Sequence, residues 1–268
     1  MMVGDEEKRR TKYRIHFAVN RFPSTVPRSP NNNWSNTVLN IQSINQYYGQ
    51  SHILWDLDLE LPEGTCGCLI GRNGVGKTTL LKCITGLLPI KDGSIIFNGK
   101  DISKASTEAR ARAGIGYVPQ GREIFPLLTV EENLKISLGA RPDGKSQVPD
   151  LIYELFPVLK EMKHRRGGDL SGGQQQQLAI GRALVLDPKL LILDEPTEGI
   201  QPNVVRDIGN VIRRLNHEFG LTVLLVEQKL PFARKVADHF YIMERGKVEA
   251  TGAIDELNDD LVQKYLSV

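Results

Sequence analysis

The chain has 268 residues, of which 40% are hydrophobic and 25% are charged, close to the average for a globular protein. This composition excludes a collagen-like, coiled-coil or mostly disordered chain, and the length suits one large or two small domains. The 34 Lys and Arg residues nearly balance 32 Asp and Glu, and a formal net charge of +2 calls for no nucleic acid partner.

The first 37 residues are predicted to form a separate, basic and disordered N-terminal extension. They contain three prolines, an Asn run and no sustained hydrophobic period. Seven Lys or Arg against three acids give this extension a net charge of +4, so residues 38–268 carry −2 of the overall +2. The alternatives are an upstream start site and a basic arm that touches anionic lipid.

Cys66, Cys68 and Cys83 lie in apolar surroundings and are too few for a disulfide framework. We expect reduced core thiols in a cytosolic protein rather than a metal site, because no His pair or second Cys pair supplies further ligands. No apolar run approaches the ~20 residues of a membrane span, and the N-terminus lacks the apolar core of a secretory signal. If this chain works at a membrane, other chains must span it.

Hydrophobic periodicity predicts the elements in chain order. Strands are expected at 39–48, 53–61, 65–70, 94–97 and 115–118, with a hairpin turn at 98–99. A helical pattern follows at 129–159, interrupted by a loop at 141–150. Helices at 175–186, 203–217 and 230–237 then alternate with strands at 189–193, 221–226, 239–243 and 247–250. Alternating apolar strands and helices predict a parallel sheet covered by helices.

A glycine-rich loop lies between the strand at 65–70 and a helix expected at 79–87. Gly71-Arg72-Asn73-Gly74-Val75-Gly76-Lys77-Thr78 matches the phosphate-binding pattern G-x-x-x-x-G-K-[ST]. The backbone N–H groups and the helix N-terminus would hold phosphates, Lys77 would reach the β- and γ-phosphates, and Thr78 would ligate Mg²⁺. The alternative, a flexible glycine turn, would not need Lys and Thr at this spacing.

Two acids, Asp194 and Glu195, end an apolar strand that begins near Leu190. Parallel strands place their C-terminal ends at one sheet edge, so these acids are expected beside the glycine-rich loop. Asp194 can hold Mg²⁺, and Glu195 can orient or deprotonate an attacking water. The alternative is a pair of acids that only cap the next turn.

The segment Leu170-Ser171-Gly172-Gly173-Gln174 opens the helix expected from residue 175. Two glycine N–H groups and a serine hydroxyl at a helix N-terminus can bind an anion. The alternative is an ordinary serine N-cap followed by a glycine hinge.

The phosphate loop, L-S-G-G-Q and L-L-I-L-D-E-P-T, in this order, resemble the ATPase subunits of ABC transporters, and the resemblance covers residues 38–268. It implies an α/β P-loop ABC ATPase with a parallel core sheet, an antiparallel β-subdomain and an inserted helical subdomain at about 121–185. It also implies ATP as substrate and Mg²⁺ as its metal. Gln120 resembles the Q-loop glutamine, which touches Mg²⁺, and Tyr48 resembles the aromatic that stacks on adenine, with a core tyrosine as the alternative.

The resemblance carries three sets of site residues. Catalytic roles are expected for Glu195, Lys77 and Gln228, and metal ligation is expected for Thr78, Gln120 and Asp194. The nucleotide-binding set comprises Tyr48, Gly71, Arg72, Asn73, Gly74, Val75, Gly76, Lys77, Thr78, Thr79, Gln120, Ser171, Gly172, Gly173 and Gln174.

Two positions depart from the usual family pattern. Gln228 stands where the family usually has His; it can donate a hydrogen bond to the γ-phosphate but carries no charge. The segment 198–202 lacks the usual dimer-facing Asp. Both departures resemble the branched-chain amino-acid branch of importer ATPases, and the loops at 71–77, 116–125 and 195–202 look like the second ATPase of urea importers. Urea is therefore the expected cargo, with branched-chain amino acids as the alternative.

The resemblance further implies a head-to-tail dimer with a second, different ATPase, because each copy holds half of each site. Membrane permease subunits, and indirectly a solute-binding protein, would be the other partners, at the cytoplasmic face of the inner membrane. A soluble ABC ATPase acting on DNA or ribosomes is a remote alternative, since those relatives usually carry long coiled-coil insertions or two ATPase units in one chain. A regulatory subunit with a dead site is disfavoured by the intact Lys77, Asp194, Glu195 and Ser171.

Overall fold

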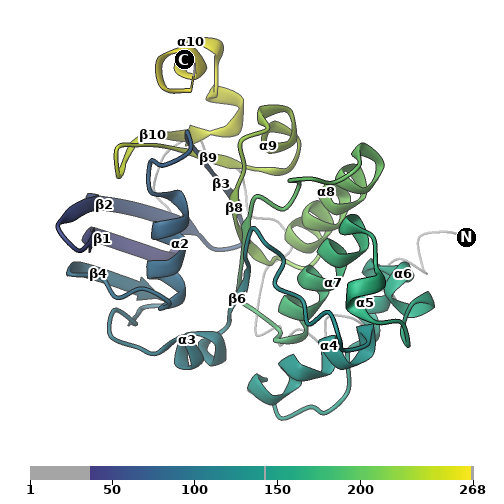
Figure 1. The fold of residues 1–268 in the computed structure, drawn as a ribbon. Helices are drawn as coiled ribbons and strands as arrows, with labels where there is room; N and C mark the ends of the chain where they lie inside the picture. Colours follow the sequence, from purple (N-terminus) through teal and green to yellow (C-terminus); the bar gives the residue numbers. More distant parts are fainter. Residues whose placement is uncertain (1–36, 142, 267–268) are drawn as a thin grey trace, which may run out of the picture.

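The computed structural model describes residues 37–141 and 143–266, which contain two β-sheets with helices around them (Figure 1). The predicted disorder of the N-terminal extension concerns residues 1–36, which lie outside the described part. The first strand, β1 (Thr37–Tyr48), begins one residue before the predicted boundary.

The larger sheet has six strands in the order β10-β9-β3-β8-β7-β6. Its parallel strands are β3 (Cys66–Ile70), β6 (Ile115–Val118), β7 (Leu190–Asp194), β8 (Thr222–Val226) and β9 (His239–Glu244), and β10 (Lys247–Ala253) pairs antiparallel with β9 at the edge. All residues of β3, β7 and β8 are buried, as expected of strands covered on both faces. The predicted parallel sheet is thereby confirmed.

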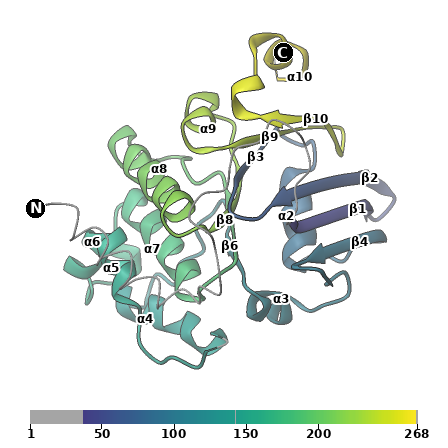
Figure 2. The same ribbon diagram turned by 180° about the vertical axis from the view of Figure 1, so that it is seen from behind.

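Successive residues of each central strand contribute to two separate cores. Leu191 and Leu193 join a core formed with the helices α7 (Gly172–Val185) and α8 (Pro202–His217). Leu190 and Ile192 join a second core with α2 (Lys77–Thr85) and the antiparallel strands. Figures 1 and 2 show α2 on one side of the sheet and α7 and α8 on the other. This alternation holds the carboxyl edge of the sheet between two packed layers.

The smaller sheet has the order β2-β1-β4-β5, all antiparallel, where β2 is Ser51–Pro62, β4 is Asp92–Phe97 and β5 is Lys100–Asp101. In β2 the predicted alternation is confirmed, because Leu57, Leu59 and Leu61 are buried while Asp58 and Glu60 are exposed. The Asn98-Gly99 turn joins β4 to β5, as expected of a hairpin signal.

Short helices occupy the stretch between β6 and β7. They are α4 (Val130–Ile136), α5 (Asp150–Leu155), α6 (Pro157–Glu161), 3₁₀ turns at Ser137–Ala140 and Gly167–Asp169, and then α7. Thr129 caps α4 through a reciprocal bond with Glu132. Figure 2 shows α4 to α6 gathered beside α7, away from β1 and β2. Residues 121–185 thus contribute helices to one side of the molecule.

Sequence patterning missed α3 (Thr107–Ala113) and α10 (Asp259–Tyr265), while α9 (Leu230–Val236) lies where a helix was expected. In α3 only Arg110 is buried. In the seven-residue α10, Leu261, Val262 and Tyr265 pack against the core but are only partly buried, so neither helix has a fully buried apolar stripe. Among the described residues, no helix has the length and apolar character needed to cross a membrane.

Candidate active site at the carboxyl edge of the sheet

The glycine-rich loop connects β3 to α2 and curls over the side chain at its own end. Lys77 is 6% exposed, and its ammonium donates to the carbonyl oxygens of Gly71 (2.7 Å) and Arg72 (2.8 Å). Burial lowers the pKa of Lys77, partly offset by the nearby Glu195 and Asp194. The loop therefore holds a cation whose bonds to carbonyl oxygens can be exchanged for bonds to phosphate.

Glycine is required at particular positions of this loop. Gly74 and Gly76 have φ of +82° and +109°, a conformation that side-chain-bearing residues rarely adopt. A Cβ at Gly71 would lie 2.5 Å from the carbonyl oxygen of Met243, so this residue must be small for β9 to approach the loop. Val75 accepts a backbone bond from Gly246, which ties the loop to the β9–β10 turn.

Thr78 and Asp194 meet at the base of the loop. The Thr78 hydroxyl donates to Asp194 Oδ2 at 3.3 Å, although 116 residues separate them in sequence. Asp194 is 2% exposed, and burial together with the neighbouring Glu195 raises its pKa to about 6. Its other oxygen, Oδ1, is buried and has no hydrogen-bond partner among the residues that the structure describes. An unpaired buried carboxylate oxygen beside a hydroxyl fits Mg²⁺, which takes one or two protein ligands and completes its shell with water and phosphate oxygens.

Glu195 is the centre of a group of polar side chains from four segments. Its carboxylate accepts hydrogen bonds from the amides of Gln228, after β8, and Gln120, after β6 (3.4 Å). Gln228 also donates to Asn73 of the glycine-rich loop at 2.8 Å. The structure thus brings together the predicted residues of all four segments at the carboxyl edge of the sheet.

The backbone of Glu195 has a φ of +48°, in the left-handed region. Two backbone bonds hold it there, from Glu195 N to Val226 O (2.9 Å) and from Glu198 N to Glu195 O (3.1 Å). Non-glycine residues in this conformation cost about 1–3 kcal/mol and cluster at functional sites. This backbone conformation directs the carboxylate out of the strand and toward Gln120 and Gln228.

Glu198 also lies at this site, and its hydrogen bond with Gln120 was not predicted from the sequence. Its carboxylate accepts a 2.8 Å hydrogen bond from Gln120, and its backbone carbonyl accepts one from Arg122 (3.3 Å). Gln120 therefore lies between two carboxylates, Glu195 and Glu198. The sequence showed only that the segment 198–202 departs from the usual family pattern. It did not indicate that Glu198 would contact Gln120, 78 residues away.

Ser171 and Gln174 form a capping box at the start of α7. The Ser171 hydroxyl accepts from Gln174 N (3.4 Å), and the Gln174 side chain accepts from Ser171 N (2.9 Å). Gly172 and Gly173 lie against Arg122 and Val204. Within the described chain no hydrogen bond joins residues 171–174 to the glycine-rich loop. The local geometry is that of a capped helix start, which leaves its first N–H groups available.

Tyr48 ends β1 and is 47% exposed, so it is not a core tyrosine. Beside it, Tyr47 stacks on His52 with ring centroids 4.0 Å apart, and His52 lies 3.6 Å from Trp55. Trp55 N donates to Gly246 O, which links this hairpin to the turn that holds the glycine-rich loop. The exposed aromatic cluster was not predicted, because Tyr47 is on β1 while His52 and Trp55 are on β2, and only the pairing of the two strands brings them together.

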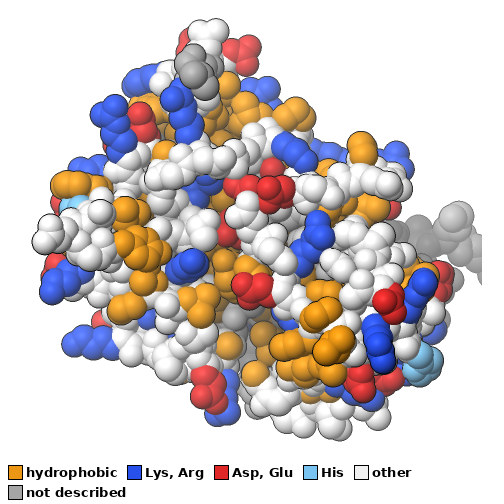
Figure 3. All heavy atoms as spheres, in the orientation of Figure 1, with side chains coloured by type: hydrophobic (Ala, Val, Ile, Leu, Met, Phe, Trp, Pro, Cys, Tyr) orange, Lys and Arg blue, Asp and Glu red, His pale blue; other side chains and the backbone are white. Residues whose placement is uncertain are grey.

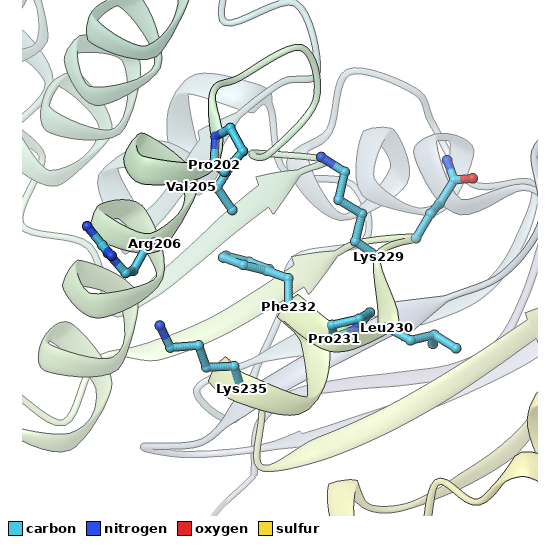
Figure 4. Close-up of a pocket in the computed structure, with 9 residues that line it drawn as sticks. Pro202, Val205, Arg206, Lys229, Leu230, Pro231, Phe232 and Lys235 are labelled. Carbon is cyan, nitrogen blue, oxygen red and sulfur yellow. The ribbon is translucent and has the colours of Figure 1, made fainter.

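A groove of about 640 Å³ adjoins the site between α8 and α9. Figure 4 shows Phe232 projecting from α9 toward α8, with Arg206 and Lys235 both on the left of the groove and Lys229 above. Gln228 and Lys229 line the end nearest Glu195. Lys229 reaches out of the groove, and its ammonium donates to the carbonyl of Thr197 at 2.9 Å.

The sequence profile described as ABC transporter matches residues 54–198. The high-affinity branched-chain amino acid transport ATP-binding protein BraG of Pseudomonas aeruginosa is 41% identical over 85% of this chain and 99% of its own length. The probable branched-chain amino acid transport ATP-binding protein LivF of Archaeoglobus fulgidus is 38% identical over 82% of this chain and 94% of its own.

Solved structures show the same fold. The ADP conformation of MJ1267, an ATP-binding cassette of an ABC transporter, superposes with a TM-score of 0.71 at 30% identity, covering 85% of this chain and 98% of MJ1267. A nucleotide-free cassette from an ABC transporter gives a TM-score of 0.70 at 29% identity, covering 87% and 96%. The expected ABC ATPase fold is confirmed. The chain therefore belongs to the ABC transporter family, as an ATP-binding and ATP-hydrolysing subunit of an import system.

Proposed function

We propose that this chain is an ATPase subunit of a branched-chain amino-acid importer. The observation that carries the proposal is the match to BraG and LivF, which extends over nearly the full length of both relatives. The importer assignment agrees with the sequence prediction, whereas the cargo differs from the one the loops suggested.

The proposed chemistry uses the residues at the carboxyl edge of the sheet. The glycine-rich loop and Lys77 bind the phosphates of ATP, with Thr79 at the start of α2 and Tyr48 beneath the base. Thr78 and Asp194 would hold Mg²⁺, which would neutralise charge on the phosphates when bound. Glu195 accepts a hydrogen bond from the attacking water and orients it toward the γ-phosphate. Gln228 and Gln120 already donate to this carboxylate and fix its direction.

The proposed assembly is a head-to-tail dimer with a second ATPase. Ser171 and Gln174 hydrogen-bond to each other, and within the described residues no hydrogen bond joins them to their own glycine-rich loop, which supports a role against the nucleotide of a partner. The two ATPases would form a heterodimer that binds the permease subunits at the cytoplasmic face of the inner membrane. A solute-binding protein would act on the other side of the membrane. Residues 121–185 would then be the subdomain that meets the permease.

Urea remains the second candidate cargo. It rests on the loops at 71–77, 116–125 and 195–202, which resemble the second ATPase of urea importers. The relatives described above give no support to urea, and the amino-acid alternative has the better support.

A nucleic-acid-linked ATPase is disfavoured by the surface charge. Figure 3 shows Lys and Arg interspersed with Asp and Glu on the face in view, rather than gathered in a single basic stripe.

Uptake in cells that lack this chain tests the proposal. We expect radiolabelled leucine uptake to be lost and urea uptake to be unchanged. Loss of urea uptake with intact leucine uptake would move the chain to the urea branch. No loss of either would contradict both cargo assignments.

A further inference from the structure

A buried hydrogen bond joins the two loops that carry Glu195 and Gln228. Thr197 is 0% exposed and Glu227 is 3% exposed, and the Thr197 hydroxyl donates to Glu227 Oε2 at 2.7 Å. The other carboxylate oxygen, Oε1, accepts the backbone N–H groups of Gln228 (3.0 Å) and Lys229 (3.1 Å). A buried carboxylate is costly unless donors surround it, so this one is held by a set of three donors that only this loop geometry provides.

Lys229 adds a second connection between the same loops. Its ammonium donates to the carbonyl of Thr197 at 2.9 Å, and Figure 4 shows it extending from the turn before α9 toward the loop that precedes α8. The turn at residues 227–229 therefore holds Thr197 by both its side chain and its main chain. We call this contact the Thr197–Glu227 bracket.

The bracket flanks the reacting groups on both loops. Thr197 follows Glu195 by two residues, and Glu227 directly precedes Gln228. Glu195 itself is in the left-handed region with a φ of +48°, a conformation that persists only where the surroundings over-determine it. Loss of the bracket would let the loop after β7 relax and would move the Glu195 carboxylate relative to Gln228.

We propose that Thr197 and Glu227 are positioning residues for ATP hydrolysis, acting through Glu195 and Gln228. The proposal rests on the proposed ATPase chemistry of this site. Neither residue hydrogen-bonds to the glycine-rich loop or to Lys77. Their loss therefore slows turnover and leaves nucleotide binding in place.

Four variants and one control separate positioning from general stability. Thr197→Val removes the hydroxyl at nearly constant volume, and Thr197→Ser keeps it. Glu227→Gln leaves one acceptor oxygen for three donors, and the double variant Thr197→Val/Glu227→Gln tests whether the pair acts as a unit. Thr222→Val is the matched control, because Thr222 is 1% exposed and its hydroxyl accepts from Gly64 N (2.9 Å) at the opposite end of β8.

The experiment measures kcat and KM for ATP in the complete import complex, together with the Tm of each variant. We expect Thr197→Val to lower kcat by roughly 10- to 100-fold, the effect of misplacing a reacting group by about 1 Å, with KM within about twofold. Thr197→Ser should retain most of the turnover. Glu227→Gln should also lower kcat, and the double variant should be no slower than the slower of its two single variants. Thr222→Val should lower Tm without a comparable loss of kcat.

Wild-type kcat in Thr197→Val, equal losses in the Ser and Val variants, or an equal loss in Thr222→Val would each overturn the positioning role. Multiplicative losses in the double variant would also overturn it. An import complex with no ATP turnover in its wild-type form would contradict the proposed function itself, and that result is distinct from the others.

Discussion

Glu195 forms hydrogen bonds with three residues that are distant from it in the sequence. Gln120, Gln228 and the backbone of Val226 all bond to it, and its own φ is positive. The motif around it predicts an acid at this strand end, but the directing contacts come from strands that are adjacent only in the folded sheet. The chemistry of the site therefore depends on where one carboxylate is aimed.

Glu195→Gln should retain ATP and hydrolyse it roughly 10²- to 10³-fold more slowly, because the phosphate-binding loop is intact and the acceptor for the water proton is weakened. Single-turnover hydrolysis and nucleotide titration on the same import complex measure the two effects. Glu198→Gln is the matched control, since its side chain contacts Gln120 rather than the proposed water position. Turnover close to wild type in Glu195→Gln would remove that role.

Lys77→Ala should weaken nucleotide affinity by at least about tenfold, or about 1.4 kcal/mol, because a buried cation that reaches the phosphates is lost. Calorimetric titration with ATP and Mg²⁺ measures the dissociation constant. Lys82→Ala is the control, since Lys82 is exposed on the same helix. Equal affinities for the two variants would refute the phosphate-binding assignment.

At the scale of elements, the buried strands were predictable and two helices were not. Strands β3, β7 and β8 are short apolar runs with no exposed face, so period and length identified them. Helix α3 buries only Arg110, and its signals are local: Ser106 caps its N-terminus and Gly114 ends it. The glycine-rich loop was predictable because it is contiguous. The Gln120–Glu198 and Thr197–Glu227 pairs were not, because they join residues that only the sheet brings together.

An ion pair after α4, between the buried Arg141 and the exposed Asp143, gives a stability prediction. The guanidinium of Arg141 donates to Val185 O (2.6 Å) and to both oxygens of Asp143, and it holds the pKa of that carboxyl well below its usual range. The pKa of an aspartate in the unfolded chain is near 3.9. Because the folded-state pKa of Asp143 is lower, the ion pair stabilises the fold above about pH 3.9, and this contribution is lost as the pH falls from there toward the folded-state pKa.

Asp143→Asn should therefore lower the free energy of unfolding by about 1 kcal/mol near pH 7, after allowing for solvent screening. The difference from wild type should narrow below about pH 4. Denaturation by urea across this pH range measures the free energy of unfolding of each variant. Asp207→Asn is the control, because Asp207 is an exposed aspartate of α8. A difference that stays constant with pH would contradict the ion-pair explanation.

Within the whole molecule, no hydrogen bond between described residues joins the glycine-rich loop to the capped start of α7. The proposed head-to-tail dimer requires that these two segments do not bind each other in one chain. Ser171→Asp keeps an N-cap of similar strength but places a negative charge where the partner's phosphates would lie. We expect unchanged ATP affinity in the isolated chain and at least tenfold slower turnover in the import complex, about 1.4 kcal/mol of repulsion.

Ser106→Asp is the matched control for this prediction, because Ser106 is the N-cap of α3 and accepts from Ala109 N. Equal turnover in the two variants would show that residues 171–174 only cap a helix. Weakened binding in the isolated Ser171→Asp chain would place that segment in the chain's own site instead.

ATP hydrolysis by this chain is proposed to drive import of branched-chain amino acids. The most direct measurement is radiolabelled leucine uptake in cells lacking the chain, complemented at equal expression with either the wild-type chain or the Glu195→Gln variant. We predict that the wild-type chain restores uptake and that the variant does not. Restoration by Glu195→Gln, or no restoration by the wild-type chain, would contradict the claim.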